Sequence, residues 1–153
     1  MKRTQLTFIL LVTTVFGKGY SQDIHQTACN GGLARLDSML QYTNLNVPDN
    51  RGRSLLHWAV ACKQMEVFSF LVNRGLDINS SDKDGFTPLY VAVQFDNEVF
   101  LDTLLDMQLN KTWATTQGAL LLEKAILNKN LSFVKKLISN GINVDIKNDR
   151  GSV

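Results

Sequence analysis

Two histidines and two cysteines are the side chains of this 153-residue sequence with the most obvious capacity for chemistry. His25 and Cys29 are four residues apart, so on a helix they share one face. His57 and Cys62 follow on a later helical segment, and two imidazoles with two thiolates could bind zinc, copper or haem iron. The five-residue spacing of His57 and Cys62 turns them toward different faces. A metal or haem site would therefore rest mainly on His25 and Cys29.

The same two cysteines could instead pair, because an exported protein meets an oxidising compartment. Both are expected on the first helices of adjacent structural units. Stacked helices lie about 8–10 Å apart, whereas a disulfide needs Cα atoms within roughly 7 Å. The comparison favours two free thiols over a bridge between Cys29 and Cys62.

Catalytic motifs are not found in the sequence. It contains no nucleophile elbow, phosphate-binding loop or paired-carboxylate motif, and Gly31 and Gly32 are better interpreted as a turn between two helices. We therefore predict that the protein is not an enzyme.

The N-terminus has the order of a secretory signal peptide: Lys2 and Arg3, an apolar run over residues 6–16, then small residues up to Ser21. Eleven apolar residues are too few for a membrane-spanning helix, which needs about 20. We expect residues 1–21 to be cleaved and the protein to be exported, to the periplasm or outside the cell. The alternative is that this segment forms a buried N-terminal helix.

Cleavage would remove three basic residues and no acidic one, so the net charge would fall from +2 to −1. The remaining chain has no basic stripe with interleaved aromatic residues, and Lys135 and Lys136 are interpreted as a solvated helix face. Nucleic acid is therefore not an expected partner, and neither is a membrane after cleavage.

Four glycines recur with a period of 33 residues, at Gly52, Gly85, Gly118 and Gly151. A fixed period of this length indicates a stacked array, in which each unit buries its apolar face against its neighbours.

Two segments around these glycines carry a recognisable motif: residues 49–59 read DNRGRSLLHWA and residues 82–92 read DKDGFTPLYVA. Both resemble the ankyrin repeat. The resemblance implies an all-α ankyrin-repeat solenoid of helix-turn-helix units with protruding turn loops. It also gives His57 a structural role, as a hydrogen-bonding residue that ties neighbouring repeats together. The domain would span residues 22–153, with units over 23–48, 49–81, 82–114 and 115–147 and a truncated turn over 148–153.

The motif also predicts local structure. Gly52 and Gly85 suit tight turns with positive φ, and Thr87 can cap a helix that begins with Pro88. Gly75 and Gly141 suit left-handed helix ends. The second helices should share one apolar stripe at Val67, Phe68, Leu71 and Val72, at Phe100, Leu101, Leu104 and Leu105, and at Phe133, Val134, Leu137 and Ile138.

The outer units depart from the pattern. The fourth keeps Gly118 but lacks the threonine-proline cap, so we expect a softer unit. In the first, Leu36 aligns with Val67 at offset 31 while Asn44 aligns with Asp77 at offset 33, which predicts two missing residues before the exit loop. Gly151 begins a turn that stops, which indicates truncation, an exposed end or pairing with another chain.

In ankyrin proteins, turn tips and adjoining first-helix positions form the concave partner-binding face. Among the matching residues, Arg51, Arg53, Phe86 and Phe95 are the types most often found at hot spots. The alternative is that Phe86 packs on its neighbouring turn and the arginines are only solvated. The full set is Asn50, Arg51, Arg53, Lys83, Asp84, Phe86, Gln94, Phe95, Thr116 and Gln117.

The functional prediction is a protein-protein interaction module without a cofactor, either an accessory or an inhibitor of an exported protein. We expect a monomer or an end-to-end dimer. A small periplasmic metal- or haem-binding accessory protein that uses His25 and Cys29 is the alternative. Trp58 is expected to be partly buried between units, whereas Trp113 could anchor a partner or cover the fourth unit.

Overall fold

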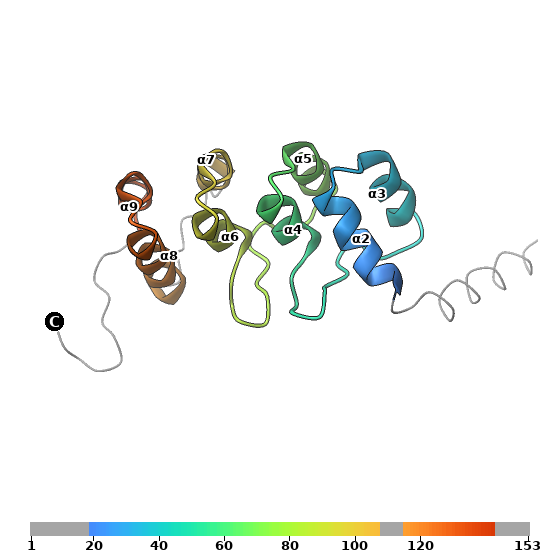
Figure 1. The fold of residues 1–153 in the computed structure, drawn as a ribbon, viewed down its shortest axis with the longest axis horizontal. Helices are drawn as coiled ribbons and strands as arrows, with labels where there is room; N and C mark the ends of the chain where they lie inside the picture. The colour runs from blue at the N-terminus through green and yellow to red at the C-terminus, as the bar shows by residue number, and fades with distance from the viewer. Residues whose placement is uncertain (1–18, 108–114, 143–153) are drawn as a thin grey trace, which may run out of the picture. The chain divides into compact units, whose positions relative to one another are not determined.

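The computed structural model describes residues 19–107 and 115–142, and of residues 19–23 and 115–117 only the backbone. This part of the chain is helical and contains no strand (Figure 1). None of its helices is long and apolar enough to cross a membrane. The predicted signal segment up to residue 18, Trp113, and the predicted final turn with Gly151 lie outside it. The eight helices are α2 Gly19–Cys29, α3 Leu33–Leu40, α4 Leu55–Ala61, α5 Met65–Asn73, α6 Pro88–Gln94, α7 Glu98–Met107, α8 Thr115–Leu127 and α9 Leu131–Ser139.

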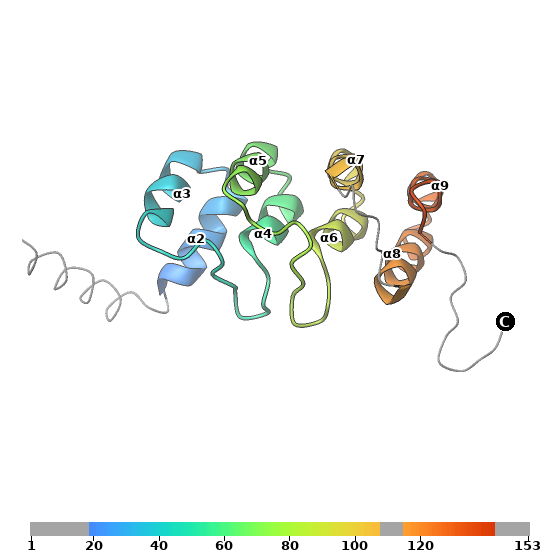
Figure 2. The same ribbon diagram turned by 180° about the vertical axis from the view of Figure 1, so that it is seen from behind.

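The helices form antiparallel pairs, each of which is one repeat (Figures 1 and 2). Two compact units are present, the first containing α2 to α5 and the second α6 to α9. Within the first unit α2 packs against α3 and α4, and within the second α6 packs against α7 and α8. The predicted all-α fold of helix-pair repeats is confirmed.

The first helices of the two intact repeats, α4 and α6, both begin at an N-cap residue, and the cap at Thr87 is the expected one. Thr87 has extended backbone angles, its hydroxyl accepts a hydrogen bond from the Tyr90 amide at 3.4 Å, and Pro88 begins α6. Ser54 occupies the same position before α4. There the Nδ1 atom of His57 accepts a hydrogen bond from the Ser54 amide at 3.1 Å.

Each intact repeat is preceded by a turn that one aspartate organises. The Asp49 carboxylate accepts hydrogen bonds from the amides of Arg51 and Arg53, both at 2.9 Å, and the Gly52 amide donates to its carbonyl. Asp82 repeats all three bonds 33 residues later. Gly52 and Gly85 both have φ of 81°, which glycine adopts with little strain. The predicted tight turns are therefore present.

The predicted apolar stripe forms the core of the second helices, most completely in α7, where all four residues are buried. In α5 three of the four are buried. In α9 only Phe133 and Leu137 are buried, while Val134 is half-buried and Ile138 is exposed. The expected stripe is thus confirmed in α7 and incomplete at the last helix.

The register of the first repeat differs from the prediction. The Gly31 amide donates to the Ala28 carbonyl, and the Lys63 amide donates to the Val60 carbonyl. Gly31 is therefore equivalent to Lys63 of the second repeat, 32 residues later in the chain. The exit loops match at offset 33, because Asn44 and Asp77 each accept from the amide two residues later. One residue is therefore missing, not two. Aligning the two repeats by their apolar residues was misleading, because several neighbouring positions carry similar apolar side chains and can be matched in more than one register. Backbone hydrogen bonds identify a single register.

The fourth repeat also differs, because α8 begins at Thr115 and includes Gly118. The protruding turn predicted here is replaced by helix, so Thr116 and Gln117 belong to the first turn of α8 and are not at a loop tip. The physical reason lies in two positions: Thr115 replaces the aspartate that organises the other turns, and Leu121 replaces the proline. Without those two signals the leucine-rich segment extends the helix toward the N-terminus.

Candidate interaction surface

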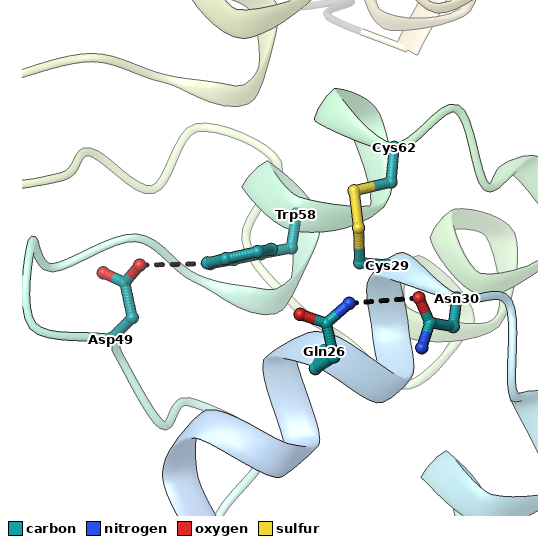
Figure 3. Close-up of a disulfide and its surroundings, with 6 residues drawn as sticks. All are labelled: Gln26, Cys29, Asn30, Asp49, Trp58 and Cys62. Atoms are coloured by element: carbon teal, nitrogen blue, oxygen red, sulfur yellow. Dashed lines mark hydrogen bonds between the residues drawn. A yellow bond between two sulfur atoms is a disulfide. The ribbon is translucent and has the colours of Figure 1, made fainter.

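Cys29 and Cys62 form a disulfide between the C-terminal ends of α2 and α4 (Figure 3). Their Cα atoms are 5.1 Å apart. The expectation of free thiols was wrong because it compared the distance between helix axes with a distance between Cα atoms. Each Cα lies about 2.3 Å from its helix axis, so facing residues of neighbouring helices approach to about 4–5 Å.

His25 is also engaged within the fold. Its side chain is 1% exposed, its Nε2 atom lies 3.0 Å from the carbonyl oxygen of Val47, and its ring lies 5.9 Å from that of Trp58. Cys29 is committed to the disulfide, so the pair does not offer a thiolate and an open imidazole. Across the described residues no group of three histidine, cysteine or acidic side chains could hold a metal ion. The proposed His25/Cys29 metal or haem site is therefore overturned.

His57 has a structural hydrogen-bonding role, but the bonds of its Nδ1 atom lie within its own repeat and do not tie it to a neighbouring one. It is 1% exposed and its Nδ1 atom accepts from the Ser54 amide and lies 2.8 Å from the Ser54 hydroxyl. This bonding occupies the imidazole at the start of its own helix. The geometry is that of a helix cap.

A cluster of three side chains holds the turn before α4. The Arg53 guanidinium forms an ion pair with Asp49 at 2.7 Å and lies over the Trp58 ring, 4.5 Å from its centroid. The Trp58 indole N–H donates to the same Asp49 oxygen at 3.1 Å (Figure 3). Arg53 is therefore part of the scaffold. Trp58 is half-buried, as predicted.

The Asp49 carboxylate has a shifted pKa because two opposing effects act on it. Burial raises its pKa, but hydrogen bonds from Arg53, Arg51 and Trp58 together lower it below the ordinary value of 3.8. Because these bonds favour the charged form, the carboxylate stays ionised while it holds the turn.

The tip of this first turn remains exposed. Asn50 and Arg51 are both exposed, and the Arg51 guanidinium has no hydrogen bond or ion pair within the described residues. Only the Arg51 backbone amide is engaged, by Asp49. The turn thus presents a cation from a backbone that hydrogen bonds hold in place.

The second turn has a similar organisation. Lys83 and Asp84 are exposed at its tip. Phe86 stacks on Tyr90, with ring centroids 4.0 Å apart and planes inclined by 8°. Burial, and then the negative charge of Glu123, raise the pKa of the Tyr90 hydroxyl. Phe86 therefore packs on its own repeat, on the helix that follows its turn, whereas the alternative considered for it was packing on the neighbouring turn.

The C-terminal ends of the first helices add apolar exposure. Phe95 follows α6 and is 52% exposed, beside exposed Gln94. In the next repeat the Asn128 side-chain amide donates to the Val93 carbonyl at 2.9 Å and to the Gln94 carbonyl at 3.4 Å. Asn128 therefore ties the end of α8 to the end of α6. Residue types alone did not indicate this role.

Of the predicted binding residues whose side chains the structure describes, Gln94 and Phe95 lie at the C-terminal end of α6, and the others form three groups. Asn50 and Arg51 lie together at the first turn, and Lys83 and Asp84 lie together at the second. Arg53 and Phe86 support these turns. The roles of Asp49 and Asp82 as turn organisers were missed, although their recurrence at the repeat period was available as a signal. The side chains of Thr116 and Gln117 lie outside the described residues.

The fold and the candidate site together define a helical-repeat protein that exposes its turns and the C-terminal ends of its first helices. The family model for ankyrin repeats in three copies matches residues 24–115 and 76–148. The chain therefore belongs to the ankyrin-repeat family, whose repeats are protein-interaction modules.

Similar curated proteins include the neurogenic locus notch homolog protein 1 of Danio rerio and of Homo sapiens, each 33% identical over 106 residues. The human neurogenic locus notch homolog protein 2 is 32% identical over the same length. In each case the match covers 69% of this chain but only 4% of the relative. The similarity is therefore confined to a repeat segment of much longer proteins.

Proposed function

We propose that this chain binds another protein through its turn tips and the adjoining ends of its first helices. The observation that carries the proposal is that both turns combine a rigid backbone with exposed tips. The carboxylates of Asp49 and Asp82 each accept two hydrogen bonds from backbone amides of the turn that follows. A pre-organised loop loses little conformational entropy when it binds.

Three residues are the best candidates for direct contact. Arg51 and Asp84 present opposite charges at the two tips, and Phe95 presents apolar area at the end of α6. Arginine and aromatic residues are common at interface hot spots. Arg53 and Phe86 would act indirectly, because they hold the turns in shape.

The proposal extends to an exported protein that serves as an accessory or inhibitor of an exported partner, without catalytic activity. A disulfide in the first unit supports export, since disulfides persist in oxidising compartments. Fractionation of the natural host followed by N-terminal sequencing tests it. We expect a mature N-terminus near residue 22, and recovery of the intact N-terminus in the cytoplasm would contradict export.

The binding proposal is tested with the full chain as bait in native extracts. The variant Arg51→Ala/Asp84→Ala/Phe95→Ala removes the three exposed contacts. The control Glu66→Ala/Arg35→Ala/Val99→Ala removes three residues of similar character that are exposed on second helices, away from the proposed surface. We expect the first variant to capture at least about tenfold less partner protein than the wild type, and the control to capture as much as the wild type.

Both variants must first show the circular dichroism and melting temperature of the wild-type protein. Equal capture by both variants would mean that the turn tips are not the binding surface.

A further inference from the structure

The third and fourth repeats can be compared residue by residue, because their backbone hydrogen bonds recur at a spacing of 33. The Asp96 amide donates to Val93 and the Lys129 amide to Ile126. Asp96 and Lys129 have φ of 49° and 56°. The side chains of Asn97 and Asn130 accept from the amides of Phe100 and Phe133. Equivalent positions are thereby established without reference to side-chain similarity.

This comparison reveals apolar residues that are buried in the third repeat and exposed in the fourth. Val93 and Leu105 are 0% and 5% exposed, whereas their equivalents Ile126 and Ile138 are 60% and 43% exposed. Leu101 is fully buried and its equivalent Val134 is only half-buried.

The third repeat is covered because the fourth packs on it (Figure 1). Helix α8 packs against α6, and the Lys136 ammonium reaches Glu98 and Asp102 on α7 at 2.8 and 2.7 Å. No described element covers the corresponding side of the fourth repeat. We call this side the end face and define it by Ile126, Lys129, Leu131, Val134, Lys135 and Ile138.

The end face carries a charge pattern opposite to that of the third repeat. Lys129 stands where Asp96 accepts hydrogen bonds from Asn128 and Asn130. Lys135 stands at the position of Asp102. Leu131, 64% exposed, replaces Glu98. Neither Lys129 nor Lys135 has an ion-pair partner within the described residues, so a binder must bring its own acidic groups.

We propose that the end face docks an amphipathic helix of another protein, whose apolar stripe is flanked by acidic side chains that pair with Lys129 and Lys135. This surface is separate from the turn tips. A second copy of this chain would fit the end face poorly. If its fourth repeat stacked here as the fourth stacks on the third, its Lys136 would lie beside Lys135, and the two ammonium groups would repel each other. Exposed isoleucine and leucine supply the apolar contact, and the two lysines select the charge of the partner.

The test uses the full chain and two synthetic helical peptides of about 20 residues, long enough to populate a helix. Both peptides carry the same leucine stripe, and the flanking positions are glutamate in one and lysine in the other. Methyl NMR reports binding at Ile126, Leu131 and Ile138. We expect the acidic peptide to shift these methyl signals and to bind at least about tenfold more tightly than the basic peptide.

The variant Lys129→Asp/Lys135→Asp restores the acidic pattern of the third repeat and should reverse the peptide preference. The matched control is Lys63→Asp, since Lys63 also has a positive φ but lies in the first unit. This control should bind like the wild-type protein. Folding of each variant is checked by its amide spectrum.

Three outcomes would overturn the proposal: equal binding of the two peptides, unchanged preference in the double variant, or methyl shifts confined to other residues. Concentration-dependent self-association that the double variant abolishes would also overturn it, because the occupant would then be a second copy. None of these results depends on binding at the turn tips.

Discussion

At the scale of single residues, the shape of the proposed interaction surface depends on side chains that we do not expect to contact a partner. Asp49 joins the turn backbone, the Arg53 guanidinium and the Trp58 indole. Asp82 repeats the backbone part of this arrangement before α6. These half-buried acceptors keep the exposed tips in position.

The lowered pKa of Asp49 predicts how acid affects stability. Its folded value lies below 3.8, so as the pH falls the unfolded chain takes up the proton first. The stabilisation from Asp49 is complete above pH 3.8 and is lost as the pH falls through the folded pKa. We expect Asp49→Asn to lower the free energy of unfolding by about 1–2 kcal/mol at pH 7, and this difference from wild type should shrink below pH 3.8.

Urea denaturation at a series of pH values measures that difference. The control is Asp84→Asn at an exposed turn position, where we expect a change within about 0.5 kcal/mol. A gap between wild type and Asp49→Asn that widens on acidification would show that the charged carboxylate does not stabilise the fold.

At the scale of elements, adjacent first helices are joined near their C-terminal ends in two different ways. The disulfide joins the ends of α2 and α4, and Cys62 is the C-cap residue of α4. Asn128, two repeat periods after Cys62, joins the end of α8 to that of α6 by hydrogen bonds. One position of the repeat therefore serves the same purpose through a covalent bond in one unit and an amide in the other.

The disulfide makes a quantitative prediction. Cys29 and Cys62 are 33 residues apart, and the chain-entropy model assigns a loop of that length about 3–4 kcal/mol. Cys29→Ser/Cys62→Ser should lower the free energy of unfolding of the first unit by up to that amount. Wild-type protein in excess dithiothreitol should match the double variant, and a variant as stable as the oxidised protein would contradict the prediction.

Sequence reasoning predicted elements well where the determining signals were local. The cap at Thr87, the Pro88 start and the glycine turns are each specified within a few residues. It failed in the fourth repeat because the loss of the turn-organising aspartate at Thr115 was not weighed against the surviving Gly118. A glycine permits a turn, but hydrogen bonds from an acceptor stabilise it.

At the scale of the molecule, the two compact units should respond differently to reduction, because repeat proteins are stabilised through contacts between nearest neighbours. Amide hydrogen exchange with mass spectrometry measures this. On reduction we expect faster exchange in α2, α3 and α4 and unchanged exchange in α9. In both the oxidised and the reduced protein, we expect faster amide exchange in the fourth repeat than in the second, because the fourth lacks the threonine-proline cap.

A uniform increase in exchange across both units would contradict this expectation and would show that the repeats unfold together. Cys29→Ser/Cys62→Ser without reductant is the matched control, since it should reproduce the reduced pattern and exclude an effect of the reductant.

The sequence by itself determined the repeat family, the helical fold, the turns at Gly52 and Gly85 and the structural role of His57. These features follow from periodicity and from residues close together in the chain. Only the tertiary structure decided that Cys29 and Cys62 pair, that Arg53 is held by Asp49 and Trp58, and that Ile126 and Ile138 are exposed. Pairing and exposure depend on which distant segments become neighbours, and no local pattern records those distances.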